Sequence, residues 1–105
     1  MPSQQWIHRF TLDFHRLAVQ RMREQPQLLE RALQTLDRWE QSGAQAASQI
    51  YRDEWRGLLR KGVSAIEASV CTEADHAATL RSMSPLGFVL SEQERLALRQ
   101  KVALA

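Results

Sequence analysis

Apolar residues recur at spacings of three and four from Gln5 to about Arg23, and this periodicity constrains the fold more than any other feature of the sequence. Residues at these spacings lie on one side of an α-helix, where they can pack against neighbouring helices. The stripe consists of Ile7, Phe10, Phe14, Leu17, Ala18 and Met22. The sequence therefore predicts a long first helix with one buried face.

A second helix is predicted from Pro26 to about Gln41. Proline lacks an amide hydrogen, which costs nothing at the first position of a helix, and the pair Ser42–Gly43 ends the pattern. The apolar stripe of this helix consists of Leu29, Ala32, Leu33, Leu36 and Trp39, with Leu28 close by. Because the break after the first helix is short, we expect the two helices to lie side by side as antiparallel neighbours.

The middle of the chain also has helical signals. A third helix is predicted after Gly43, and it ends at Gly62 with Arg60 and Lys61 in its last turn. Its buried face consists of Tyr51, Trp55, Leu58 and Leu59. Two shorter helices are expected next, one around Ile66 and one from Glu73 to about Ser82. Each follows a candidate N-terminal box, and these boxes are Ser64 with Glu67 and Thr72 with Asp75.

The segment from Leu80 to Leu98 contains the most clearly marked turn. Pro85 keeps Ser84 out of helical dihedral angles and Gly87 can take a positive φ, so the preceding helix must stop. We expect the apolar residues of this turn to pack on the bundle, and they are Leu86, Phe88, Val89 and Leu90. The last helix is predicted from Glu92 to about Val102, opened by a capping box of Ser91 and Glu94.

No segment shows the sustained apolar and polar alternation of a β-strand. With 105 residues, 44% of them hydrophobic, the chain is long enough to bury one core without disulfides. We therefore predict an all-α fold, a compact bundle of about five helices in which residues 1–105 form a single helical domain.

Cationic residues are spaced regularly along the first helix. Arg9, Arg16 and Arg23 repeat every seven residues, and His8 and His15 do the same beside them. Such a row is either a solvated face or a basic edge that binds carboxylates or phosphates, because the arginine fork matches both groups. The net charge of +2 is small, so it permits an acidic protein or a nucleic acid as partner without requiring either.

The residue patterns typical of enzymes and metal sites are missing from the sequence. His8 and His15 are two helical turns apart, about 10 Å, and cannot share one metal ion. No motif pairs a nucleophile with a base, and no glycine-rich loop could cradle a phosphate. The single cysteine, Cys71, is expected to be an ordinary buried or half-buried residue. We therefore expect no catalytic residue, no cofactor and no metal.

The sequence has no apolar run long enough to cross a membrane and no secretory signal pattern, so we expect a cytoplasmic protein. A helix-turn-helix is the alternative to a protein-binding function. The predicted second and third helices are joined by Ser42–Gly43, and the third carries residue types that read base edges, namely Gln45, Gln49, Arg52 and Arg56. Asp53 and Glu54 on the same helix would repel phosphates.

Several short motifs, in this order, resemble a family of small helical bacterial proteins of unassigned activity that occur in two-gene operons of the toxin–antitoxin type. The most specific is the pattern SP-x-G-x-VLS-x-x-ER, from Ser84 to Arg95. The others are Phe14–His15–Arg16–Leu17, Arg38–Trp39, Glu54–Trp55 with Leu58–Leu59, and Leu80–Arg81. The resemblance implies an antitoxin-like or regulatory partner protein, and no functional residue carries over from it.

Taken together, these patterns favour a non-enzymatic protein-binding module, such as the antitoxin or regulatory partner of a bacterial two-gene system. A DNA-binding regulator of the helix-turn-helix type is the alternative. The expected partner is another protein, for example a toxin encoded by a neighbouring gene; weak binding of a nucleic acid is compatible with the sequence, and no membrane is expected as partner. The residues predicted to bind it lie on the first and last helices and are Arg9, Arg16, Arg23, Leu96 and Arg99.

Overall fold

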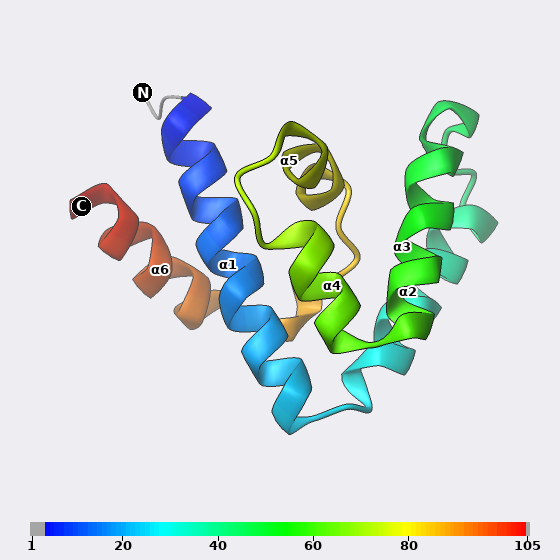
Figure 1. The fold of residues 1–105 in the computed structure, drawn as a ribbon, viewed down its shortest axis with the longest axis horizontal. Helices are drawn as coiled ribbons and strands as arrows, with labels where there is room; N and C mark the ends of the chain where they lie inside the picture. The colour runs from blue at the N-terminus through cyan, green and yellow to red at the C-terminus, as the bar shows by residue number, and fades with distance from the viewer. Residues whose placement is uncertain (1–3, 105) are drawn as a thin grey trace.

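The computed structural model describes residues 4–104, and all regular structure in this range is helical. The six α-helices are α1 (Gln4–Glu24), α2 (Leu28–Gln41), α3 (Gln49–Lys61), α4 (Val63–Val70), α5 (Asp75–Ser82) and α6 (Glu92–Leu104). Two short 3₁₀ turns, η1 (Ala46–Ser48) and η2 (Gly87–Val89), precede α3 and α6. The all-α prediction is confirmed, with six helices instead of about five (Figure 1).

The long helix α1 contacts α4, α5 and α6, and α4 lies between α1 and α3. The core side of α1 carries Leu12, Phe14, Ala18, Val19 and Met22. The radius of gyration is 13.6 Å. A compact chain of this length would have a value of about 13 Å, so the helices form one packed unit.

The expected antiparallel pairing of α1 with α2 is wrong. Helix α2 packs instead against α3, and the two form an antiparallel pair on the side of the molecule away from α6 (Figure 1). The reason is that α4 and α5 cover the core side of α1. Ile66 and Val70 of α4 are fully buried, and they fill the surface that α2 would otherwise have covered.

Two tryptophans predicted to be buried have different environments. Trp55 of α3 is 0% exposed, and its indole Nε1 donates a hydrogen bond of 2.9 Å to the carbonyl oxygen of Leu80. Trp39 is 37% exposed, so the prediction that it belongs to the buried stripe is wrong. It lies in the last turns of α2, beyond Leu36, the last fully buried residue of that helix.

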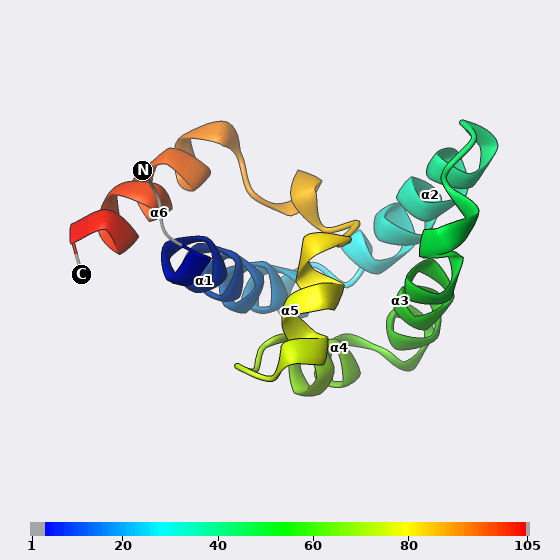
Figure 2. The ribbon, with the colours of Figure 1, turned by 90° about the horizontal axis from the view of Figure 1, so that it is seen from above.

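The turn between α5 and α6 packs on the bundle, as predicted. Its buried residues are Pro85, Leu86, Val89 and Leu90, whereas Phe88 is only half-buried. Gly87 does not have the positive φ that was expected of it; it begins η2 instead. In Figure 2 this turn forms the connection that crosses between α2 on one side and α6 on the other.

Only one of the three predicted capping boxes forms with both of its hydrogen bonds. The Glu94 amide donates to Ser91 Oγ at 3.1 Å, and the Ser91 amide donates to Glu94 Oε1 at 2.9 Å. Helices α4 and α5 begin without a side-chain cap. Glu67, expected to cap α4, forms an ion pair with Arg23 instead. None of the helices within residues 4–104 is long and apolar enough to span a lipid bilayer.

Candidate functional site

Three aromatic side chains follow one another along α1 at intervals of four residues. The Trp6 and Phe10 rings are stacked with their centroids 5.7 Å apart, and the Phe10 and Phe14 rings follow at 6.2 Å. Two arginines of α6, also four residues apart, lie over this row. The guanidinium carbon of Arg95 is 5.7 Å from the centroid of Phe14, and that of Arg99 is 5.5 Å from the centroid of Phe10. The equal spacing on the two helices produces two cation–π contacts in register.

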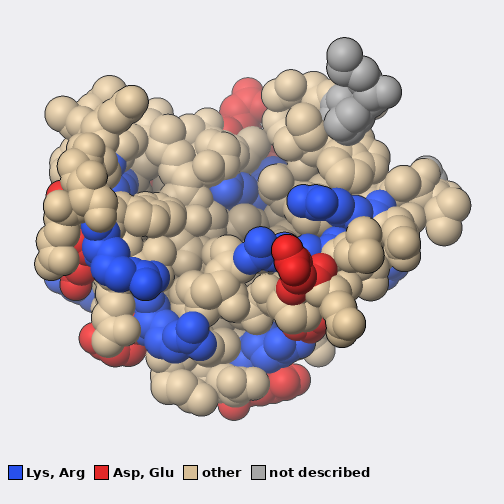
Figure 3. Space-filling model, turned by 180° about the vertical axis from the view of Figure 1, so that it is seen from behind, with Lys and Arg blue, Asp and Glu red and all other residues tan. Residues whose placement is uncertain are grey.

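A hollow of about 220 Å³ opens beside these contacts, and we call it the arginine hollow. Its lining residues are Phe10, Thr11, Phe14, His15, Arg81, Ser84, Gly87, Arg95 and Arg99. A second hollow, of about 360 Å³, adjoins it along α6 and is lined by Glu92, Gln93, Arg95, Leu96 and Arg99. Figure 3 shows a depression in this face of the molecule, with basic side chains on both sides of it. The arginine hollow is smaller than the roughly 300–1,000 Å³ of a typical small-molecule site, but it admits a side chain of another molecule.

Arg95 occupies the centre of this site. Its Nε atom is buried and has no hydrogen-bond partner among the described residues. Its guanidinium group lies beside the backbone of Gly87, because a Cβ placed on Gly87 would be 3.5 Å from Arg95 Nη2. On the α2 side of the same turn, the guanidinium carbon of Arg31 lies 4.5 Å from the ring centroid of Phe88. Within residues 4–104, no carboxylate lies within ion-pair distance of Arg31, Arg95 or Arg99.

The residues predicted from sequence to bind a partner are divided between two faces. Leu96 and Arg99 lie together on α6 beside Arg95, and Leu96 is 56% exposed. Arg9, Arg16 and Arg23 are exposed on another face of α1, and each already has a carboxylate. Arg9 and Arg16 flank Asp13, at 3.1 and 3.5 Å, and Arg23 binds Glu67 at 2.8 Å. The row of arginines is therefore present, and each member has an ion-pair partner within the chain, with Arg9 and Arg16 sharing the one carboxylate of Asp13.

His15 does not belong to that exposed row, contrary to the sequence analysis. It is 3% exposed and forms part of the floor of the arginine hollow. Its Nδ1 lies 2.7 Å from the carbonyl oxygen of Thr11, which can only accept, so Nδ1 must carry the proton. Nε2 therefore accepts a hydrogen bond of 2.7 Å from the Ser84 hydroxyl. Burial, with a smaller effect of the positive charge of nearby Arg81, lowers the pKa of His15 to about 4.

This serine–histidine pair has the contacts of a nucleophile and its general base, but its chemistry is weak. A base with a pKa near 4 takes little of the hydroxyl proton at neutral pH. The Ser84 Oγ atom also accepts a hydrogen bond of 3.1 Å from the amide of Leu86. The arrangement therefore fastens the turn before α6 to α1 and gives the hollow a rigid floor.

Arg81 stiffens the same floor from α5. Its Nη1 donates to the carbonyl oxygens of Val70 and Thr72, both at 2.7 Å, and its Nε donates to Thr11 Oγ1 at 3.3 Å. Burial lowers the pKa of the Arg81 guanidinium, which remains charged. Since three carbonyl and hydroxyl oxygens hold Arg81, it supplies positive charge to the hollow without being free to move.

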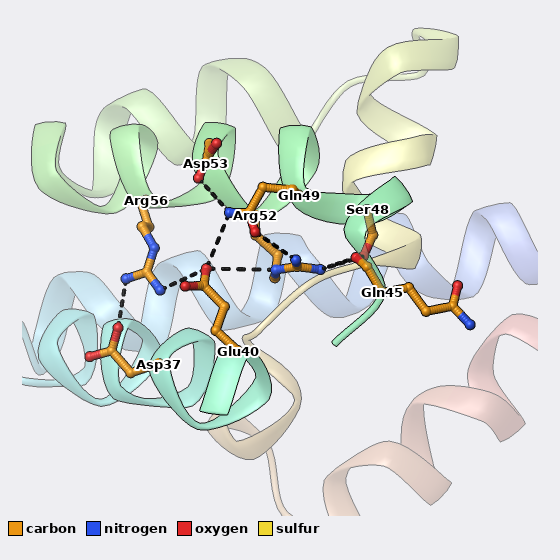
Figure 4. Close-up of polar contacts among 8 residues, drawn as sticks. All are labelled: Asp37, Glu40, Gln45, Ser48, Gln49, Arg52, Asp53 and Arg56. Carbon is orange, nitrogen blue, oxygen red and sulfur yellow. Dashed lines mark hydrogen bonds and ion pairs between the residues drawn. The ribbon is translucent and has the colours of Figure 1, made fainter. Parts of the chain in front are cut away.

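The side chains behind the helix-turn-helix interpretation are engaged between α2 and α3 (Figure 4). Arg56 binds Asp37 at 2.7 Å and Glu40 at 2.9 Å, and it holds the pKa of Glu40 below its usual range. Arg52 is only 4% exposed and donates to the Gln45 carbonyl, to Ser48 Oγ and to Gln49 Oε1. Three of the four proposed base-reading side chains, Gln49, Arg52 and Arg56, therefore form part of this network.

No group of three histidine, cysteine or acidic side chains that could hold a metal ion occurs within residues 4–104. Cys71 is half-buried, and burial raises the pKa of its thiol, so it is less reactive than an exposed cysteine.

Comparison with models of known protein families, with curated proteins and with solved structures finds no match to this chain. Its function therefore has to be argued from the site. Sequence analysis identified Leu96 and Arg99 but missed Arg95, Arg31 and the rings beneath them. One signal was present, because Phe10 and Phe14 have the same spacing as Arg95 and Arg99.

Proposed function

We propose that this chain is a non-enzymatic protein-binding module, an antitoxin-like or regulatory partner of a second protein, and that it binds through the arginine hollow and the adjoining face of α6. One observation carries the proposal. Arg95 and Arg99 lie over phenyl rings beside the hollow, Arg31 lies over a ring on the α2 side of the turn, and no carboxylate of residues 4–104 is within ion-pair distance of any of them. Carboxylates of a partner protein would complete these interactions.

The energetics of an unpaired guanidinium group support this proposal. A guanidinium on a ring has lost part of its hydration, and a cation–π contact of about 0.5–1 kcal/mol replaces only some of it. A partner's carboxylate adds charge-assisted hydrogen bonds in bidentate geometry. Arginine and aromatic residues also supply most of the residues that dominate binding energy in protein interfaces. The exposed Leu96 adds an apolar contact beside the two charges.

No observation favours the DNA-binding alternative to the same degree. Its candidate base-reading arginines, Arg52 and Arg56, already have partners in α2 and in the turn before α3. A nucleic acid remains one outcome of the experiment. Binding by phosphate contacts would weaken log-linearly with salt concentration.

Co-purification with the product of the neighbouring gene tests the proposal. We expect the double variant R95E/R99E to lose the partner. The double variant R9E/R16E makes the same change in net charge on the other face of α1, and we expect it to retain the partner. Far-UV circular dichroism should show both variants to be folded. The proposal fails if R95E/R99E retains the partner, if both variants lose it, or if the neighbouring product never binds.

The DNA arm of the experiment uses duplex DNA from the upstream region of the gene. We expect weak binding without sequence preference. Sub-micromolar, sequence-dependent binding by the purified chain would replace the protein-binding proposal with the DNA-binding one.

A further inference from the structure

We infer that the partner segment that fits the arginine hollow is an acidic α-helix with two carboxylates four residues apart on one face. This inference rests on the proposed function, since it names the chemistry of the partner at the same site. It is drawn from the spacing of Arg95 and Arg99, from the rings that hold them, and from the order of charges along α6.

The spacing of the two arginines matches a helix. Arg95 and Arg99 are four residues apart, which places their Cα atoms about 6 Å apart along α6. A partner helix that lies alongside α6 has the same repeat, so side chains at i and i+4 meet the two guanidinium groups together. Carboxylates two residues apart would point to nearly opposite sides of the partner helix, and only one could bind.

The two guanidinium groups are held in position before a partner arrives. Phe14 and Phe10 support them from below at 5.7 and 5.5 Å, and Phe14 is itself buried. Gly87 limits the movement of Arg95 on a second side. A pre-positioned arginine loses less side-chain entropy on binding than a free one, which favours a ligand of fixed spacing over a flexible acidic chain.

The charges along α6 and across the hollow define the rest of the partner. Glu92 lines the adjoining hollow one turn before Arg95, and it would repel an acidic residue there. Glu94 is not available to a partner, because it binds Arg21 at 2.6 Å. On the α2 side of the turn Arg31 lies over Phe88, so positive charge is present on both sides of this turn. Leu96 provides the contact for an apolar side chain between the two acids.

Synthetic peptides test the inference with the intact protein. The probe is a fluorescein-labelled, alanine-rich helical peptide of about 16 residues, long enough to have measurable helicity, with two glutamates four residues apart and a leucine between them. Its isomer has the two glutamates two residues apart, and a third peptide has glutamine in place of both. Fluorescence anisotropy at low salt measures binding. We expect the isomer to bind about tenfold more weakly than the first peptide, and the glutamine peptide more weakly still.

Variants of the protein assign the binding to the hollow. R95E/R99E should abolish the preference among the peptides, whereas R9E/R16E should retain it. Equal binding of the first peptide and its isomer would overturn the inference, and so would a preference that survives in R95E/R99E. If co-purification still depends on Arg95 and Arg99 in that case, the proposed function stands and only the acidic helix is wrong. Tighter binding of a short labelled duplex DNA, dependent on Arg95 and Arg99, would also overturn it.

Discussion

Arg52 and Arg56, between α2 and α3, have surroundings opposite to those of Arg95 and Arg99, between α1 and α6. Between α2 and α3, Arg52 and Arg56 are surrounded by acceptors, including the carboxylates of Asp37 and Glu40. Between α1 and α6, Arg95 and Arg99 lie on phenyl rings, and no carboxylate of residues 4–104 is within ion-pair distance of them. Guanidinium groups of the first kind stabilise the chain, because their charge is neutralised within it. Those of the second kind keep their charge available for another molecule.

The largest effect is expected at Arg52, which is buried and donates to three acceptors. Arg52→Ala removes a buried cation and leaves the Gln45 carbonyl and Ser48 Oγ without this donor, whereas Glu40 keeps Arg56. Losing one member of such a network should lower the free energy of unfolding by about 3 kcal/mol. Urea denaturation measures it. A loss below about 1 kcal/mol would mean that the α2–α3 network contributes no more than a surface ion pair.

His15, in the floor of the arginine hollow, should make the free energy of unfolding depend on pH. The folded pKa of His15 is about 4, below its ordinary value of 6.5, so the unfolded chain binds a proton in this window that the folded chain does not. Stability is therefore complete above pH 6.5 and falls as the pH is lowered toward 4. At pH 4.5 the loss should be about 2.5 kcal/mol relative to pH 8.

His15→Gln is the control for this pH dependence, since glutamine does not titrate. The difference between the wild type and the variant isolates His15 from the carboxylates. Glu94, whose pKa is lowered to about 2 by Arg21 and Ser91, contributes stability that is lost only below about pH 4.5. Equal slopes for the two proteins between pH 6.5 and 4.5 would show that His15 titrates normally.

A smaller effect is expected at the turn between α5 and α6, which contains Phe88. Phe88→Ala should lower the free energy of unfolding by about 2 kcal/mol, less than for a fully buried phenylalanine, because the ring is half-buried. Arg31→Ala, which removes the cation above that ring, should lower it by less than about 1 kcal/mol. Thermal unfolding compares the two. If Arg31→Ala lowered the free energy of unfolding as much as Phe88→Ala does, Arg31 would be an arginine that stabilises the chain, as Arg52 and Arg56 are.

The smallest effect is expected at Gly87. Its φ is not positive, and an added Cβ would meet Arg95 Nη2 at 3.5 Å, an ordinary contact. Gly87→Ala should therefore change the free energy of unfolding by less than about 0.5 kcal/mol, as for a surface substitution. A loss above 1 kcal/mol would show that the Arg95 guanidinium is fixed more rigidly than its contacts indicate.

Local signals in the sequence predicted the fold better than the site. The spacing of apolar residues identified the helices, and Ser91 with Glu94 correctly marked the start of α6. The pairing of α2 with α3 could not be read in the same way, because it depends on which helix covers α1. Arg95 was missed because its role depends on its surroundings in the folded chain. The ring beneath its guanidinium group belongs to Phe14, which is 81 positions away in the sequence, and no carboxylate of residues 4–104 is within ion-pair distance.

The double variant R95M/R99M tests most directly whether the arginines of α6 serve binding rather than stability. Methionine keeps a side chain on the rings of Phe14 and Phe10, and it removes both the unpartnered Nε of Arg95 and the repulsion between two cations. Urea denaturation at neutral pH measures its free energy of unfolding. We expect the value to equal or exceed that of the wild type, as at sites where function costs stability. A loss of more than about 2 kcal/mol would show that Arg95 and Arg99 hold α6 on α1, and it would contradict the distinction drawn between the two helix pairs.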